Sequence, residues 1–520
     1  MKARRRTSWA VLLLVGLSAA SGCRRDGVDE SRHDQADQAV IRRWGRPTRD
    51  LPKVKLAVIT PHNENIQNEF EWAFKRHHAL AYGERVEVEW VDVGGGGSSI
   101  ERYLHNVYRQ HDTSRIDVIW GGGDFTFHNL VRPTIRHEQG LLEPMTLPAD
   151  ILEQIPAEHA GVAFRDPHLR WIGTAVSGFG FLHNAGMIRR CNLGPPPQKW
   201  NDLGDSRFTD LLVLADPSQS SSVANVYRLI VASADDWQAG WDRLMTVLSN
   251  AKRISDSAGQ AVNAPALGDA LIAASIDFYG MMREVEAPAE LEYVSPAGQT
   301  PFTPDPIGIL RNPPHGEIAR RFVEFVLSRR AQAIWALPVG DADGPARSVL
   351  GRLPIRRDVF EAYAGRLIPQ TVNFYRSGRT MQVSAEMARI HFEVLRMLVT
   401  AAAVDNTDLM RAARRRLNEL EGDPARRAEY LARRAMFTRL PDNVDTLEEM
   451  NALPRQFRVL DHRRAEQIAA AFRAARGREM TDAEKRIHLA PAYRRDLRAV
   501  HRVSTGWREY FRGVFAEVAR

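Results

Sequence analysis

Short apolar runs alternate with amphipathic stretches between residue 54 and about residue 360, and this pattern predicts an α/β fold. The first runs have the length and the β-branched composition of buried strands: Val54 to Ile59, Val86 to Val91 and Ile116 to Trp120. A helical pattern follows the first run, and Gly94 to Gly97 form a loop after the second. Strands that alternate with helices predict a parallel sheet, whose ligands bind beyond the carboxyl ends of the strands.

Strand-like runs continue through the middle of the chain and nearly cease after about residue 380. The later runs are Trp171 to Leu182, Leu211 to Ala215, Ile272 to Phe278 and Ile307 to Leu310. Beyond residue 380 the sequence is rich in arginine, and its apolar residues recur at helical spacing. The pattern therefore predicts an α-helical C-terminal extension over residues 380–520.

The N-terminus has the order of an export signal. A basic segment precedes an apolar run from Trp9 to Leu17, and small residues lead to Cys23. The cysteine after small residues resembles the bacterial lipobox, so we expect residues 1–23 to be a lipoprotein signal with lipid on Cys23, and residues 24–52 to be a flexible tether. A plain signal peptide or an uncleaved anchor remains open. Arg24 follows the cysteine, which by the enterobacterial pattern favours the outer membrane.

Composition narrows the class of protein. If Cys23 is lipidated, the second cysteine, Cys191, has no disulfide partner. No later apolar run has the length of a membrane span. The net charge of +7 suits anionic ligands or lipids, and the export signal argues against nucleic acid. We found no P-loop, HExxH, GxSxG or CxxC motif and no histidine cluster with metal-ligand spacing, so we expect neither an enzyme nor a cofactor or metal.

Several short motifs occur in an order that resembles one family. They are Ile59 to Asn63, Asp117 to Gly123, Ser177 to Phe181, Ala215 to Ser222, Ser257 to Gly259, Ile276 to Gly280 and Ile307 to Gln332. Together, over about residues 54–360, they resemble the type-two periplasmic binding proteins, in the branch of ferric-iron, aminoethylphosphonate and sugar-phosphate binders. The resemblance implies two α/β lobes around a ligand cleft, with lobe I at 54–175 plus 302–375 and lobe II at 176–301.

Three loops have the chemistry of an anion site. His62 and Asn63 precede a predicted helix, whose free amides and dipole favour an anion. Gly122 and Gly123 let the backbone approach a ligand closely. The serines at positions 220–222, Ser220, Ser221 and Ser222, follow a strand and bring hydroxyls to the same edge. A surface histidine, a tight turn and simple helix capping are the respective alternatives. The resemblance adds Ser177, Gly178 and Ser257 as ligand-binding candidates.

Asp277 and Tyr279 bear on which solute is bound. In the ferric-iron binders that the chain resembles, two adjacent tyrosines at this stretch coordinate the metal. Here the stretch reads Asp277-Phe278-Tyr279, and the phenylalanine cannot be a ligand. A phosphorylated or phosphonate organic anion is therefore preferred over Fe(III). Asp277 contacts an amine or hydroxyl of the solute, or alternatively it stabilises a lobe through a hydrogen bond.

Together these features predict the substrate-binding component of an ABC transporter. It would close its cleft on a small anionic solute and deliver it to a membrane permease from the periplasmic side of the cell envelope, held at a membrane by its lipid. A ferric-iron-binding protein of the same fold, an envelope sensor or enzyme without a transport role, and a structural envelope lipoprotein are the alternatives.

Overall fold

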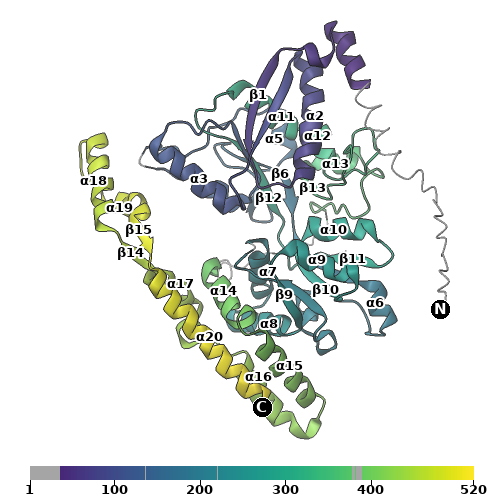
Figure 1. The fold of residues 1–520 in the computed structure, drawn as a ribbon, viewed down its shortest axis with the longest axis vertical. Coiled ribbons are helices and arrows are strands. Elements are labelled where there is room, and N and C mark those ends of the chain that lie inside the picture. The colour runs from purple at the N-terminus through teal and green to yellow at the C-terminus, as the bar shows by residue number, and fades with distance from the viewer. Residues whose placement is uncertain (1–34, 135, 220, 377–380, 382–388) are drawn as a thin grey trace, which may run out of the picture.

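The computed structural model describes residues 35–134, 136–219, 221–376, 381 and 389–520. It contains a six-stranded and a five-stranded sheet, each covered by helices, and a helical region that runs along one side of the molecule (Figure 1). The prediction of a two-lobed α/β fold with a helical C-terminal region is confirmed.

The six-stranded sheet forms lobe I. Its strand order is β13 (Leu353–Pro354), β6 (Ile172–Ser177), β12 (Thr303–Ile309), β3 (Val118–Trp120), β1 (Lys53–Ile59) and β2 (Arg85–Val91). The strands β1, β2 and β3 are parallel, and β12 returns antiparallel to β3. The helices of this lobe are α2 (Glu64–Tyr82), α3 (Gly97–Gln110), α4 (Asp124–Leu130), α5 (Ala149–Gln154), α11 (Gly316–Val326), α12 (Arg329–Ala333) and α13 (Arg357–Ala362). A small hairpin joins β4 (Glu158–His159) to β5 (Val162–Ala163).

The five-stranded sheet forms lobe II. Its order is β11 (Leu291–Val294), β7 (Phe179–Asn184), β10 (Ile272–Ile276), β8 (Leu212–Ala215) and β9 (Ala251–Ser255). Its helices are α6 (Ala185–Arg190), α7 (Ser221–Ala232), α8 (Trp237–Ser249), α9 (Ala258–Leu267) and α10 (Asp277–Glu286).

The chain crosses from lobe I to lobe II at Gly178, between the end of β6 and the start of β7. The strand-like run from Trp171 to Leu182 is two strands that belong to different sheets, and the lobe boundary expected at 175/176 falls inside this run. The peptide of Gly178 is held instead by Asp277, whose carboxylate accepts its N–H at 2.6 Å. The chain returns to lobe I between β11 and β12. We propose lobe boundaries at these two crossings.

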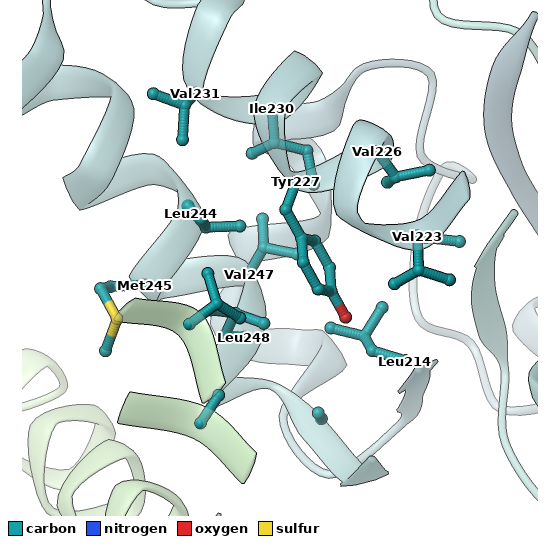
Figure 2. Close-up of a cluster of buried hydrophobic side chains, with 14 of the residues drawn as sticks. Leu214, Val223, Val226, Tyr227, Ile230, Val231, Leu244, Met245, Val247 and Leu248 are labelled. Atoms are coloured by element: carbon teal, nitrogen blue, oxygen red, sulfur yellow. The ribbon is translucent and has the colours of Figure 1, made fainter. Parts of the chain in front are cut away.

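The C-terminal helices share one hydrophobic core with lobe II. They are α14 (Phe392–Val399), α15 (Thr407–Glu421), α16 (Arg427–Phe437), α17 (Leu447–Gln456) and α20 (Leu497–Ala519). In Figure 2 the side chains of α7 and α8 surround Tyr227, which donates to the Ala215 carbonyl at 2.7 Å, and segments of the extension pass beside Met245. The ring of Trp241 on α8 lies 6.0 Å from that of Phe511 on α20. The extension is therefore part of the folding unit of lobe II.

Polar contacts join the extension to lobe II as well. Arg434 forms two 2.7 Å hydrogen bonds with the two oxygens of Asp242, and Trp237 donates to the Val444 carbonyl at 3.0 Å. The far end of the extension consists of α18 (His462–Arg476), α19 (Asp482–His488) and two short paired strands, β14 (Arg458–Leu460) and β15 (Tyr493–Arg495), which the sequence pattern did not predict.

The described part of the predicted tether is folded, which corrects the expectation of a flexible segment over residues 24–52. Residues 35–44 are helical, and Val40 is buried against Leu51 and Ala79 of α2. Trp44 donates to the Leu80 carbonyl at 3.1 Å. Burial of these apolar side chains offsets the entropy of ordering the segment. Residues 1–34, including Cys23, lie outside the described residues, and within the described residues no helix is long and apolar enough to cross a membrane.

Candidate ligand-binding site

His62 lies in a buried polar cluster at the start of α2, not on the surface. Its Nε2 is 2.8 Å from Asp305 Oδ2 and 3.2 Å from Arg352 Nη1. Burial lowers the pKa of His62 despite the neighbouring carboxylate of Asp305. Its Nδ1 is buried and has no hydrogen-bond partner among the residues that the structure describes. Asn63 is the N-cap of α2, because its Oδ1 accepts the amide of Ile66 at 3.1 Å.

Asp305 and Arg352 connect three of the predicted site residues. Arg352 donates to Asp305 at 2.6 Å and to the hydroxyl of Ser177 at 3.1 Å, while the Gly123 amide donates to Asp305 at 3.3 Å. Burial acts to raise the pKa of Asp305, but Arg352 and His62 together hold it far below its ordinary value. The carboxylate therefore stays ionised and balances the charge of Arg352.

Arg352 also reaches toward the other lobe. Its guanidinium lies 5.1 Å from the centre of the Phe278 ring at the start of α10, and Arg352 is only 4% exposed. Its Nε is buried without a hydrogen-bond partner in the described part of the chain. The cluster of His62, Asp305, Arg352 and Ser177 thus lies where the two lobes meet, on the side of the crossing at Gly178.

The glycine loop is required for this packing. Gly121 has a φ of 83°, and a Cβ there would come within 2.6 Å of His62 Nε2. Gly122 and Gly123 also have positive φ angles, 100° and 79°. A Cβ on Gly97 would fall 2.5 Å from the Gly122 carbonyl oxygen, so two glycine-rich loops pack closely against each other. The sequence predicted that the backbone of this loop approaches a ligand closely. Among the described residues, the loop approaches other parts of the chain, namely His62 and Gly97.

Asp277 is fully buried at the crossing between the lobes. Its carboxylate accepts the amides of Gly178 at 2.6 Å and Phe278 at 2.7 Å, and its own amide donates to the Gly178 carbonyl at 3.0 Å. Burial raises the pKa of Asp277 to about 6. This placement favours the alternative of a lobe-stabilising hydrogen bond over direct contact with a solute. The ring of Tyr279 lies 4.4 Å from that of Phe278, and the residue is half-buried.

The predicted serines fall into different settings. Ser257 is the N-cap of α9 and accepts the Gln260 amide at 3.2 Å, which is the capping role given as an alternative for such serines. Ser220 lies outside the described residues. Ser221 and Ser222 begin α7, where the positive end of the helix dipole favours an anion, but their side chains are not described.

Arg228 on α7 is a charged residue that sequence reasoning missed, as it missed Asp124, Asp305 and Arg352. It is half-buried, burial lowers its pKa, and the carboxylate of Asp124 at the start of α4 acts to raise it. Burial raises the pKa of Asp124, and the positive charge of Arg228 acts to lower it. These two residues belong to different lobes, so the electrostatic interaction between them acts across the junction of the lobes. The Nε of Arg228 is buried without a hydrogen-bond partner among the described residues.

Positions 221, 225 and 228 share one face of α7, and this spacing is the signal that could have found Arg228. Asn225 is half-buried like Arg228. The face therefore combines the helix N-terminus, an amide side chain and a guanidinium opposite lobe I, a combination suited to a small anion that also carries a hydroxyl or ammonium group for Asp124. No group of three His, Cys, Asp or Glu side chains suited to a metal occurs in the described residues.

Two α/β lobes with polar groups from both at their junction define a two-lobed binding protein. Residues 117–343 match the family described as "Bacterial extracellular solute-binding protein". This part of the chain, less than half of its length, is thus similar to extracellular solute-binding proteins, which agrees with the resemblance read from the sequence. The proteins of this family bind solutes and are not enzymes, as expected from the missing catalytic motifs.

Curated relatives are distant and match only in part. The phosphoglycerate transport regulatory protein PgtC of Salmonella typhimurium is 26% identical over 186 residues, which cover 36% of this chain and 46% of the relative. Iron uptake protein A1 of Synechocystis is 24% identical over 219 residues, 40% of this chain and 58% of that protein. The chain thus spans about half the length of the curated relatives it matches. Among solved structures, the periplasmic binding protein AfuA of Actinobacillus pleuropneumoniae is similar at 17% identity and a TM-score of 0.47, over 69% of this chain and 96% of AfuA.

Proposed function

We propose that this protein is the substrate-binding component of an ABC transporter and that it captures a phosphorylated or phosphonate organic anion between its lobes. The observation that carries the proposal is Arg228, a half-buried cation on the same face of α7 as the helix N-terminus and opposite lobe I. A phosphate-like group would be attracted by the dipole at the N-terminus of α7 and would accept hydrogen bonds from this guanidinium. The relative named for phosphoglycerate transport supports the same solute class.

Lobe closure is the proposed binding mechanism. A solute held by α7 in lobe II gains contacts with Asp124 and the glycine loops of lobe I only when the lobes come together, so binding shifts the open–closed equilibrium toward closure. The hinge is the crossing at Gly178, which Asp277 fixes from lobe II. The closed form would then dock on a permease, with the lipid on Cys23 keeping the protein at a membrane on the periplasmic side, for which the outer membrane is the favoured location.

Two other functions of the same fold remain as proposals. Iron uptake protein A1 is a reason to keep ferric iron as a solute, although Phe278 interrupts the expected tyrosine pair and Asp277 is engaged by two backbone amides. PgtC is named as a regulatory protein, which favours an envelope sensor of a solute as the second candidate. Growth on the bound solute in a deletion strain separates transport from sensing, because a sensor affects transcription of other genes and not uptake itself.

Calorimetry with the mature chain tests the solute class. We expect one-to-one binding of one member of a panel of 3-phosphoglycerate, 2-aminoethylphosphonate and glucose 6-phosphate, and no binding of spermidine or Fe(III) citrate. Arg228→Ala should weaken binding by about 10- to 100-fold, the cost of losing a charged hydrogen bond. Arg253→Ala, on β9, is the matched control. Heat from Fe(III) citrate alone, with a coloured phenolate band, would contradict the proposal.

A further inference from the structure

A cavity of about 590 Å³ lies away from the junction of the lobes, between the helical residues 35–44 and the outer face of lobe I. Its walls come from that helix, from α2, from α11 and α12, and from the loop at residues 342–344. Small-molecule sites commonly have volumes of about 300–1,000 Å³, so the cavity has the size of a binding site.

The wall formed by residues 35–44 has a defined position. Val40 is 2% exposed and packs on Leu51 and Ala79, and Trp44 donates to the Leu80 carbonyl. Asp37 accepts the amide of Thr48 at 2.8 Å, which fixes the turn that follows the helix. Ala36, Ala39 and Arg42 of the same helix line the cavity.

The charged side chains around the cavity are mainly cationic. Arg42, Arg76 and Arg330 come from three different elements, and Asp343, the one carboxylate among the described lining residues, lies 3.6 Å from Arg330. The guanidinium of Arg76 stacks 4.3 Å from the centre of the Trp72 ring. Among the described lining residues, three guanidinium groups and one carboxylate give a surplus of positive charge, which favours an anionic occupant.

The rest of the lining is largely apolar. Trp72, Leu80, Phe325 and Ile334 contribute side chains to it. His77 also lines the cavity; burial lowers its pKa, and Arg330 lowers it further, so at neutral pH it presents an uncharged ring. An occupant that uses both features has an anionic head near the arginines and a hydrocarbon body against the aromatic and aliphatic side chains.

We propose that this cavity is a second binding site, for an amphiphilic anion such as an alkyl phosphate. The shared chemistry is a phosphate on a hydrocarbon chain, and it comes either from a free molecule or from a membrane lipid. With a membrane lipid as the source, binding at this cavity would bring lobe I to a membrane surface. The inference is independent of the solute bound between the lobes.

Calorimetry with octyl phosphate below its critical micelle concentration tests the site on the mature chain. We expect one molecule bound per chain, with inorganic phosphate and 1-octanol each binding at least about tenfold more weakly, because each has only half of the required chemistry. Flotation with phosphatidylglycerol vesicles, compared with phosphatidylcholine vesicles, tests the lipid source. Binding of octyl phosphate without vesicle binding assigns the site to the free molecule.

Variants locate the binding. Arg330→Ala and Arg76→Ala should each weaken octyl phosphate by about five- to tenfold, while Arg320→Ala, an exposed arginine on α11 outside the lining, should have no effect. Ala39→Leu fills the cavity from a half-buried helical position and should abolish binding without unfolding the protein, which circular dichroism checks.

Three results would overturn the proposal. They are equal affinity for octyl phosphate and inorganic phosphate, binding that Ala39→Leu leaves unchanged, and binding that Arg228→Ala abolishes. The last result would place octyl phosphate between the lobes. Loss of solute binding in Arg228→Ala with retained octyl phosphate binding supports both sites. Because solute binding and octyl phosphate binding are measured separately, one proposal can be refuted while the other stands.

Discussion

Replacement of Phe511 by alanine tests whether the C-terminal helices belong to the folding unit of lobe II. Phe511 on α20 is fully buried, with its ring 6.0 Å from Trp241 of lobe II and 5.7 Å from Phe515. A phenylalanine side chain buries about 150 Å², and at about 25 cal/mol per Å² its loss removes about 4 kcal/mol of transfer free energy. This agrees with the roughly 3–5 kcal/mol found for buried Phe→Ala changes, which include the cavity left behind.

Hydrogen exchange is the decisive assay. In a shared core the substitution lowers protection not only in α20 but also in the central strands β8 and β10 of lobe II, while the strands of lobe I keep theirs. Urea unfolding followed by circular dichroism gives the loss of stability. Leu431→Ala on α16 is the matched control, because Leu431 is 51% exposed and its loss should change stability by less than about 0.5 kcal/mol. Unchanged protection of β8 and β10 in Phe511→Ala would refute a common core.

Three further outcomes follow from the polar cluster, the crossing and the anchor. Gly121→Ala should destabilise lobe I by about 2 kcal/mol or more in urea unfolding, because its Cβ would meet His62 at a positive φ, whereas Gly365→Ala, also at positive φ but with open space, should cost about 1 kcal/mol. Burial raises the pKa of Asp277 from 3.8 to about 6, so the unfolded chain releases this proton at lower pH than the folded protein does. The free energy of unfolding should therefore fall as the pH rises from about 4 to about 6, by up to about 3 kcal/mol. Asp277→Asn should lose this part of the pH dependence, and an unchanged slope would contradict the assignment. Cys23→Ser should move the protein from the membrane to the soluble fraction, and retention at the membrane would indicate an uncleaved apolar anchor.

The strands and the two-lobed fold could be predicted because apolar runs of strand length are a local signal. Both the run from Val54 to Ile59 and that from Leu211 to Ala215 contain a strand in the structure, and the last four residues of each run are buried. The crossing near Gly178 was expected only from the family resemblance, because the residues on both sides of it are equally apolar and give no local signal. What separates them is the bond from Gly178 to the carboxylate of Asp277, a residue distant in sequence.

The candidate site was predicted with less success because helix capping and ligand binding use the same residue types. Asn63 and Ser257 cap helices in the structure, and a sequence alone does not separate that role from an anion contact. Arg228 was missed because it stands as a single charge among apolar helical residues, where only its spacing from Ser221 marks the face. Asp305 and Arg352 connect across the fold, so no local pattern joins them to His62.

The common core of lobe II and the C-terminal helices also determines when this lobe can fold. A chain made from its N-terminus has the residues of α7 and α8 long before those of α20, yet Trp241 is buried in part by Phe511, and Phe515 and Val518 lie in the same core. Until that late segment arrives, the lobe has an exposed apolar surface that attracts chaperones or other unfolded chains. The slow step in folding should therefore be the docking of α20, a contact between segments far apart in the sequence, and a protein shortened at its C-terminus should aggregate even though every strand of its two sheets is present.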